Sequence, residues 1–296
     1  RSVLRDNKGK VIMELASPDL TRLYETGWKM PEPFTVKAAD GHTDLYGFMW
    51  KPFDFDSTRR YPIISYVYPG PQTEAIPLEF SVTAAYNVGL AQIGFVVVTF
   101  GHRGGSPMRD KWYHTFGYNN LRDYPLADDK CGIEQLADRF SFIDKSKVGI
   151  FGHSGGGFMS TAALCTYPDF YTAAVSSAGN HDNNIYNQWW GETHHGVREV
   201  KSFEKKTVKD SITGKDTTIS VEKIKFETKI PTNIELAKNL KGDLMLVTGD
   251  VDNNVHPANT LRMADALLKA GKNFDLVILP GQAHSFMGIQ QAFYQR

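Results

Sequence analysis

The sequence predicts an α/β fold in which a mostly parallel sheet is covered by helices on both faces. Apolar, strand-like runs alternate with helix-compatible stretches along most of the 296 residues. A Gly-x-Ser-x-Gly segment at 152–156 lies between one such strand and one such helix. A strand–helix–strand unit spans 243–279 and is followed by a histidine. A chain of this length can bury one large core, so a single main domain is expected.

The first half of the chain is expected to supply one side of the sheet. Two alternating stretches with Ala39-Asp40-Gly41 between them indicate a β-hairpin. Apolar runs indicate two further strands before the first long helix. In order, the expected elements are a strand-like piece at 10–15, the hairpin at 32–50, strands at 63–68 and 95–100, and a helix at 121–137.

Residues 152–156, Gly-His-Ser-Gly-Gly, have the sequence form of a nucleophile elbow. They follow the apolar run 148–151 and precede a helix-compatible stretch at 158–164. The turn is so tight that glycines must flank the serine, and the strained serine backbone holds its hydroxyl clear of the sheet. Ser154 is therefore the candidate nucleophile, with a plain glycine-rich turn as the alternative. A further strand is expected at 172–176.

A nucleophilic serine needs a base, and the base needs an acid to orient it. A strand at 243–248 leads into a loop with two aspartates, and a strand at 274–279 leads into a loop with one histidine. The chain order Ser, Asp, His is the one found in α/β hydrolases. The candidates are therefore Ser154, one of Asp250 or Asp252, and His284.

Two further histidines lie close to these candidates in the sequence. His153 adjoins the serine and is expected to point to the opposite side of the turn. His256 precedes Pro257 and is expected to start a helix over 257–270. No set of ligands suited to tetrahedral coordination is evident, so neither a metal nor another cofactor is expected.

The charge balance argues against two classes of partner. Lys and Arg number 33 and so do Asp and Glu, which disfavours nucleic acid or an anionic membrane as the main partner. No apolar run approaches the length of a membrane span. The two cysteines say little about the redox compartment, so the location of the protein stays open.

Residues 201–229 depart from the α/β rhythm. They are rich in Lys, Thr, Glu and Asp, and Thr213-Gly214 separates two alternating stretches at 207–212 and 218–226. This pattern predicts a protruding, mainly solvated β-hairpin inserted into the domain. The alternative is an interface arm or a part of the substrate rim.

Several motifs occur in a fixed order along the chain. They are Tyr68-Pro69-Gly70-Pro71, Gly101-His102-Arg103-Gly104-Gly105, the serine elbow, Asp252-Asn253-Asn254-Val255-His256 and Ala283-His284. With these motifs the chain resembles, over most of its length, the catalytic domain of the prolyl oligopeptidase family of serine peptidases, and within it the dipeptidyl peptidase IV branch. The catalytic aspartate of that family lies three residues before the valine, which selects Asp252 over Asp250.

The resemblance implies an α/β-hydrolase fold and a reaction. It implies a triad of Ser154, Asp252 and His284 that cleaves peptides through an acyl-enzyme, after Pro or Ala near the N-terminus of oligopeptides. The oxyanion would be bound by two donors. One is the backbone N–H of Gly155, the residue after the nucleophile, and the other, by resemblance, is the hydroxyl of Tyr68.

The resemblance also implies residues that bind substrate. Asn254 and Val255 match positions that contact the substrate, and Tyr186 and Trp190 match a pair of tyrosines that walls a slot for proline. Trp190 replaces one of those tyrosines, and Gly155 stands where the branch usually has a tyrosine. Both departures argue against a strict preference for proline. The alternative is that the aromatics are ordinary packing residues.

The resemblance sets the expected domain organisation. Residues 1–30 are expected to be a linker or a remnant of a preceding β-propeller domain, and residues 31–296 the catalytic domain with the hairpin insertion. The acidic pair that captures a free N-terminus belongs to the propeller side, so exo- and endopeptidase action stay open. A peptide substrate is the expected partner. A homodimer and a periplasmic or secreted location of the full-length protein are further expectations.

Two other functions remain open from the sequence. A carboxylesterase or lipase would share the elbow and the triad on the same fold. The Tyr68-Pro69-Gly70-Pro71 segment in place of a His-Gly-Gly loop argues against it. A binding module without catalytic activity would keep only the fold.

Overall fold

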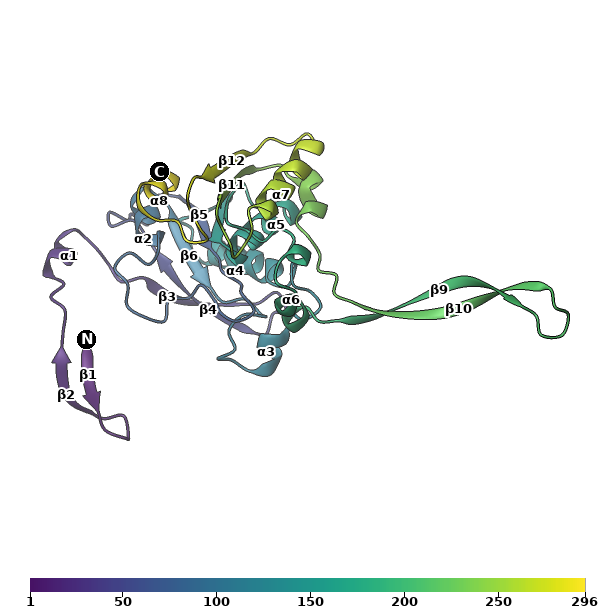
Figure 1. Ribbon diagram of the computed structural model, residues 1–296. Coiled ribbons are helices and arrows are strands. Elements are labelled where there is room, and N and C mark those ends of the chain that lie inside the picture. Colours follow the sequence, from purple (N-terminus) through teal and green to yellow (C-terminus); the bar gives the residue numbers. More distant parts are fainter. Residues whose placement is uncertain (296) are drawn as a thin grey trace.

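An eight-stranded sheet forms the centre of the molecule in the computed structural model, which describes residues 1–295 (Figure 1). The strand order is β12-β11-β8-β7-β5-β6-β4-β3. Pairing is parallel from β12 to β6 and antiparallel for β6 with β4 and for β4 with β3. Helices cover both faces of the sheet (Figure 1). The predicted α/β class with a mostly parallel sheet is confirmed.

The strands of this sheet fall close to their predicted places. β5 ends two residues earlier than expected, which leaves Tyr68 in the loop that follows it. The strands are β3 (Glu32–Lys37), β4 (Asp44–Trp50), β5 (Tyr61–Tyr66), β6 (Val96–Phe100), β7 (Ile143–His153), β8 (Ala173–Ser177), β11 (Asp243–Gly249) and β12 (Asp275–Leu279).

The helices include several that the sequence did not predict. The predicted helix at 121–137 begins only at Leu126, directly after Pro125, because proline suits the start of a helix and not its interior. The helices are α1 (Thr21–Glu25), α2 (Asn87–Gln92), α3 (Lys111–Thr115), α4 (Leu126–Arg139), α5 (Gly155–Thr166), α6 (Gln188–His194), α7 (Ala258–Lys269) and α8 (Gly288–Tyr294), with 3₁₀ turns η1 (Asn183–Ile185) and η2 (Ile234–Asn239).

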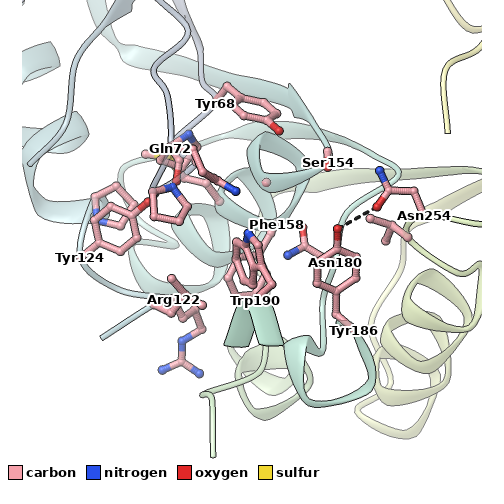
Figure 2. Close-up of a pocket in the computed structure, with 18 of the residues that line it drawn as sticks. Tyr68, Gln72, Arg122, Tyr124, Ser154, Phe158, Asn180, Tyr186, Trp190 and Asn254 are labelled. Carbon is pink, nitrogen blue, oxygen red and sulfur yellow. Dashed lines mark hydrogen bonds between the residues drawn. The ribbon is translucent and has the colours of Figure 1, made fainter. Parts of the chain in front are cut away.

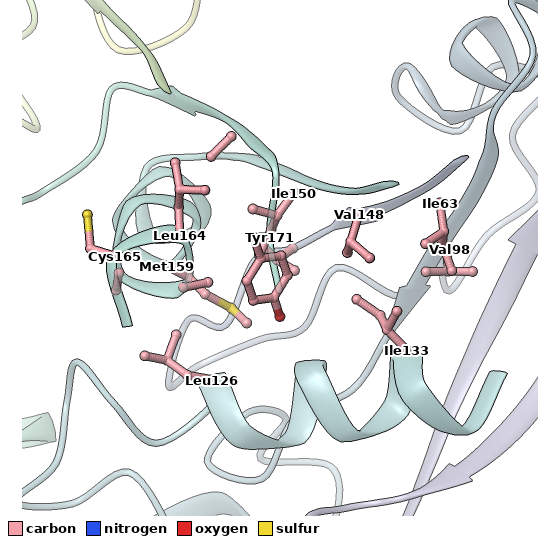
Figure 3. Close-up of a cluster of buried hydrophobic side chains, with 14 of the residues drawn as sticks. Ile63, Val98, Leu126, Ile133, Val148, Ile150, Met159, Leu164, Cys165 and Tyr171 are labelled. Carbon is pink, nitrogen blue, oxygen red and sulfur yellow. The ribbon is translucent and has the colours of Figure 1, made fainter. Parts of the chain in front are cut away.

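The main core lies between the central strands and helices α4 and α5 (Figure 3). Central parallel strands are apolar on both faces because helices cover both, and all five residues of β6 are buried. Helix α5 is buried along ten of its twelve residues. This packing fixes the helix that starts at the serine elbow. Labelled members of the cluster are Ile63, Val98, Leu126, Ile133, Val148, Ile150, Met159, Leu164, Cys165 and Tyr171.

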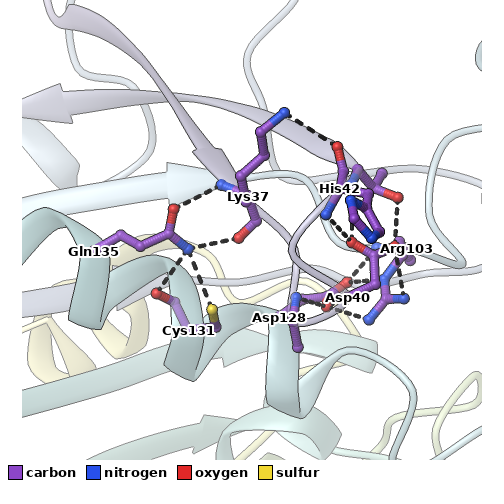
Figure 4. Close-up of polar contacts among 9 residues, drawn as sticks. Lys37, Asp40, His42, Arg103, Asp128, Cys131 and Gln135 are labelled. Atoms are coloured by element: carbon purple, nitrogen blue, oxygen red, sulfur yellow. Dashed lines mark hydrogen bonds and ion pairs between the residues drawn. The ribbon is translucent and has the colours of Figure 1, made fainter.

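Arg103 of the Gly-His-Arg-Gly-Gly motif connects its own loop to the β3–β4 turn and to α4 through ion pairs (Figure 4). Its guanidinium donates to the carboxylate of Asp128 at 2.7 Å and to that of Asp40 at 3.1 Å. Asp128 is fully buried in α4, and it also accepts the backbone N–H of Ala39. Burial opposes ionisation of Asp40, but hydrogen bonds from Thr43 and the charge of Arg103 outweigh it and lower the pKa of Asp40. The motif therefore joins the β3–β4 turn to α4.

Two β-hairpins lie outside the sheet (Figure 1). β1 (Ser2–Arg5) and β2 (Val11–Ala16) pair only with each other among the described residues. β9 (Arg198–Lys209) and β10 (Asp216–Glu227) pair over their full lengths and project far from the sheet as a two-stranded arm. The arm, at 198–227, overlaps the protruding hairpin that the sequence predicts at 201–229.

Candidate active site

Ser154 lies between the end of β7 and the start of α5. Its backbone has a positive φ, which the tight turn at this point imposes. Its φ is 57° and its ψ is −120°. A Cβ on Gly152 would approach the backbone of Gly156 to 2.6 Å, and a Cβ on Gly156 would collide with the carbonyl oxygen of Val67. A Cβ on Gly155 would meet nothing within 4 Å. Two of the glycines are therefore required by sterics, and Gly155 is not.

The structure brings His284 and Asp252 together from two different loops. His284 follows β12, Asp252 follows β11, and the distance from Nδ1 of the histidine to Oδ2 of the aspartate is 2.8 Å. The Asp252 side chain is fully buried, and its Oδ1 accepts the backbone N–H groups of Asn254 and Val255. These bonds hold the carboxylate in place.

Asp250 is not a partner of His284. It is exposed, and its Oδ1 accepts the backbone N–H of Gly281 at 2.6 Å. Of the two aspartates that the residue pattern left open, the geometry pairs Asp252 with the histidine. His256 has the place expected of a helix-start residue, since its Nδ1 accepts the backbone N–H of Ala258.

Ser154 and His284 line the same cavity. No hydrogen bond joins the serine hydroxyl to the imidazole among the described residues, and the serine backbone N–H donates to the carbonyl of Ser177. Hydrogen bonds between catalytic groups are often long in sites without substrate and tighten only in the complex. The arrangement suits proton transfer from the serine to a histidine whose other ring nitrogen is held by a carboxylate.

The expectation for His153 is wrong. Its ring does not point away from the site but packs against His284, with 4.7 Å between the ring centroids, and against Phe286. Its Nδ1 lies 2.8 Å from the hydroxyl of Ser177. Burial, together with the neighbouring His284, lowers the pKa of His153 to about 4. The ring is therefore neutral at neutral pH, and it forms a wall beside the other imidazole.

The cavity around Ser154 has a volume of about 310 Å³ (Figure 2). All the predicted site residues line this cavity except Asp252, which contacts His284 through the Nδ1–Oδ2 pair. Figure 2 shows the hydroxyl of Tyr68 directed towards Ser154. The predicted residues that line the cavity are Tyr68, Ser154, Gly155, Tyr186, Trp190, Asn254, Val255 and His284.

The loop that carries Tyr68 is anchored by another residue that lines the cavity. The hydroxyl of Tyr124 donates to the carbonyl of Pro69. Tyr124 is buried, and burial together with the nearby Glu74 and Tyr68 raises the pKa of its hydroxyl. Tyr124 therefore stays protonated and keeps its donor on the loop.

The two aromatics predicted to wall a slot do lie side by side. The rings of Tyr186 and Trp190 are 5.5 Å apart and nearly perpendicular. The Tyr186 hydroxyl donates to Oδ1 of Asn254 at 2.7 Å (Figure 2). Behind them, Trp190 packs on a small apolar cluster that includes Ile230. The aromatics thus face a cavity as well as packing against neighbours.

Several residues of the cavity were missed by reasoning from the sequence. Three of them follow a predicted motif by a few positions, but nothing in the sequence says which residues turn inward. Phe158 and Met159 belong to the first turn and a half of α5, and Gln72 follows the Tyr-Pro-Gly-Pro segment. The other missed residues are Leu121, Arg122, Tyr124, Pro125 and Asn180.

Within residues 1–295 no group of three or more His, Cys, Asp or Glu side chains is placed to hold a metal ion. Over the same residues no helix has both the length and the apolar character needed to cross a membrane.

Comparison with known proteins gives a family and several relatives. The model of the prolyl oligopeptidase family matches residues 80–295. Human dipeptidyl peptidase 8 is 29% identical over 256 residues, which cover 86% of this chain and 26% of that protein. Mouse prolyl endopeptidase FAP is 25% identical over 256 residues, which cover 86% of this chain and 31% of that protein. The chain thus spans about a quarter to a third of the length of these curated relatives.

A solved structure is similar over nearly the whole chain. It is a Bacteroides ovatus protein classed provisionally as a dipeptidyl aminopeptidase IV, with a TM-score of 0.78 and 26% sequence identity. The match covers 99% of this chain and 38% of that one. The α/β-hydrolase fold expected from the motifs is thereby confirmed.

Proposed function

The chain belongs to the prolyl oligopeptidase family, and from that premise we propose that it hydrolyses peptides with Ser154 as the nucleophile, His284 as the base and Asp252 as the orienting acid. The observation that carries the proposal is the 2.8 Å pair of His284 and buried Asp252 at the edge of the cavity that contains Ser154. An imidazole held in this way is the central part of a serine peptidase.

The proposed reaction begins with proton transfer. His284 takes the proton of the Ser154 hydroxyl as the oxygen attacks the substrate carbonyl, and then gives it to the leaving amine. Asp252 keeps Nδ1 protonated and stabilises the imidazolium that forms. The acyl-enzyme is hydrolysed by water in the same two steps, with His284 again as base and acid.

The oxyanion of the tetrahedral intermediate would be bound by two donors. We assign the backbone N–H of Gly155 at the start of α5 and the hydroxyl of Tyr68. Support comes from the direction of the Tyr68 hydroxyl in Figure 2 and from the hydrogen bond that anchors its loop to Tyr124. A fixed donor aimed at the developing charge contributes about 3–4 kcal/mol to catalysis.

The proposed substrate is an oligopeptide cleaved after Pro or Ala near its N-terminus, as the names of the dipeptidyl peptidase and prolyl endopeptidase relatives suggest. Tyr186 and Trp190 would wall the subsite for the residue whose carbonyl is attacked, and Asn254 and Val255 would contact the substrate beside it. We further propose that residues 1–30 link this domain to another, of β-propeller type. Selection for a free N-terminus would then depend on that other domain.

A hydrolysis panel tests the proposal. Purified chain is assayed on p-nitrophenyl esters, on dipeptide anilides with a free N-terminus and on N-blocked peptides. We expect amide hydrolysis that Ser154→Ala lowers by at least about 10³-fold. Hydrolysis of the esters alone would favour a carboxylesterase, and unchanged amide hydrolysis in Ser154→Ala would refute the assignment of the nucleophile.

A further inference from the structure

The arm formed by β9 and β10 carries apolar side chains that the other described residues leave largely uncovered. Its two strands pair only with each other among those residues, and Figure 1 shows the arm projecting far from the sheet. No residue of either strand is buried. An isolated two-stranded hairpin is only marginally stable in water, so apolar residues on it favour a partner. The larger apolar residues of the arm are Val200, Phe203, Val208, Ile219, Val221, Ile224 and Phe226.

The largest of these side chains lie together on one face of the arm. Directly opposed residues of an antiparallel ladder point to the same face, and so do alternate residues along a strand. Phe203, Ile224 and Phe226 occupy alternate rungs of the β9–β10 ladder and therefore share a face. They are 69%, 51% and 72% exposed. A buried aromatic side chain covers about 150–250 Å², so these three residues, here called the arm patch, offer a few hundred Å², a size that marks interaction sites.

The charges around the arm patch are balanced in sign and ordered along the strand. On β9 the same face carries Glu199 and Lys201 towards the base and Lys205 towards the tip. Lys201 also forms an ion pair with Glu222 of β10 at 2.8 Å. Because the two signs cancel, the face favours neither a strongly acidic nor a strongly basic partner. When a second β9 is laid over the first in the opposite direction, Glu199 of one lies opposite Lys205 of the other.

We propose that the arm patch is an interaction surface for a second copy of this chain, with the two arms packed face to face and antiparallel about a two-fold axis. Such an interface is self-complementary, as a two-fold axis requires. Each Phe203 then lies against Lys201 of the second copy, and each Glu199 pairs with a Lys205. Packed sheets cross at about 30°, an offset that side chains as long as Glu and Lys can span.

The size of the contact sets the expected affinity. With both copies and the flanking side chains counted, the contact approaches the lower size of a specific interface, about 1,200 Å². We therefore expect a dissociation constant of about 1–100 µM. Phe203 does not line the cavity, so the inference goes beyond the proposed peptidase function and does not depend on it.

Sedimentation velocity of the full chain, over concentrations that span this constant, tests the inference. We expect the native chain to form a dimer as its concentration rises. Phe203→Ser should raise the dissociation constant by at least about tenfold, because each dimer loses two buried rings. Ile212→Ser is the matched control, since Ile212 is 93% exposed but lies at the tip of the arm, outside the ladder. It should leave the constant as it is.

Charge reversal tests the antiparallel arrangement. Glu199→Lys alone and Lys205→Glu alone each place like charges together twice in a dimer, so each variant should associate at least about tenfold more weakly than the native chain. An equimolar mixture of the two variants restores both pairs of opposite charges and should associate about as tightly as the native chain.

Three results would overturn the inference. A native chain that stays monomeric would leave the arm patch to a different partner. A native dimer that Phe203→Ser does not weaken would lie on another surface. A mixture of the charge variants that associates no better than either variant alone would exclude the antiparallel contact. None of these results bears on peptide hydrolysis, so the peptidase proposal is tested separately.

Discussion

Ser154 is held in a conformation that L-residues adopt only at a cost. A positive φ outside glycine costs about 1–3 kcal/mol and persists only where the surroundings impose it. Here β7, α5 and the close approach of Gly152 and Gly156 to the Val67 strand end impose it. Because these requirements are local, the pentapeptide together with the strand before it and the helix after it was enough to predict the elbow.

The orientation of neighbouring side chains was not predictable in the same way. His153 lies beside His284, and Asn180 lines the same cavity as Tyr68, because segments far apart in the sequence arrive there in the folded molecule. No short pattern in the sequence encodes these meetings. The choice between Asp250 and Asp252 likewise stayed open from the residues alone, since both follow the same strand. Only the family resemblance pointed to Asp252.

The wall that His153 forms beside His284 leads to a prediction. In His153→Ala the imidazole of His284 keeps its bond to Asp252 but loses the ring packed on its face. We expect kcat to fall by about 10- to 100-fold, because small misplacements of a catalytic group have effects of that size. KM should change less, since His153 does not line the cavity. Steady-state kinetics on one peptide substrate measures both.

His153→Phe is the matched control, because a phenyl ring restores the packing without the imidazole. It should recover most of the lost kcat. Equal losses in the Ala and Phe variants would show that packing is not what His153 provides.

At the scale of elements, the arm formed by β9 and β10 supports the cavity wall at its base, which is the end where the chain leaves β10 and reaches Ile230. Ile230, just after β10, exchanges two backbone-to-side-chain hydrogen bonds with Asn184, and its side chain packs behind Trp190. Along the arm itself, Phe203, Ile224 and Phe226 are exposed. The base of the arm therefore supports the aromatic slot, whereas the tip does not touch it.

Shortening the arm tests this division. Replacing residues 201–224 by Asn-Gly joins Val200 to Lys225, which already face each other in the ladder, through a two-residue hairpin turn. We expect peptide hydrolysis within a few-fold of the native chain. Ile230→Ala should instead destabilise the protein by about 2–5 kcal/mol and weaken substrate binding, because it leaves a cavity behind Trp190. Loss of hydrolysis in the shortened chain would place the tip in the reaction or its assembly.

Helices and strands with a clear repeat of apolar residues were predicted from the sequence. Short helices that form through packing against the rest of the fold were not. The central strands and α7 lie within a few residues of their expected bounds. Helices α2, α3 and α6 have only five to seven residues, too few for a repeating apolar face to be visible. The strand before Tyr68 was extended too far because its apolar pattern continues past the last paired residue.

At the scale of the molecule, the sheet explains how the site is assembled. β5, β7, β8, β11 and β12 are parallel, so their carboxyl ends meet at one edge. The loops at these ends carry Tyr68, Ser154, Asn180, Asp252 and His284. Residues far apart in the sequence therefore converge because of strand direction alone. The predicted order of strands and helices indicates that these residues lie at the same edge of the sheet. It does not give the distances between their side chains.

Two histidines, the buried His181 and the half-buried His153, make the stability of the whole molecule depend on pH. Burial lowers the pKa of His181 to about 3, and burial with the nearby His284 lowers that of His153 to about 4. In the unfolded chain both are expected near the ordinary value of about 6.5. The unfolded chain therefore binds more protons below pH 6.5, and stability present above that pH is lost as the pH falls towards 4.

Urea unfolding at pH 7.0, 6.0 and 5.0 measures this loss. We expect the free energy of unfolding to fall with a slope that approaches about 1.4 kcal/mol per pH unit for each histidine. His181→Gln should remove the contribution of one and flatten the curve. A stability that is constant from pH 7.0 to 5.0, or an unchanged slope in the variant, would contradict this account of the buried rings.

The rate at which a fluorophosphonate labels Ser154 tests the assembled triad most directly, since the reagent needs an activated serine and no particular peptide. Peptide mapping should find one label per chain, on Ser154. Asp252→Asn should slow the labelling by about 10³- to 10⁴-fold, whereas Asp250→Asn, two residues away and exposed, should leave it within a few-fold. Equal rates in the two variants, or a label on another serine, would contradict the proposed site.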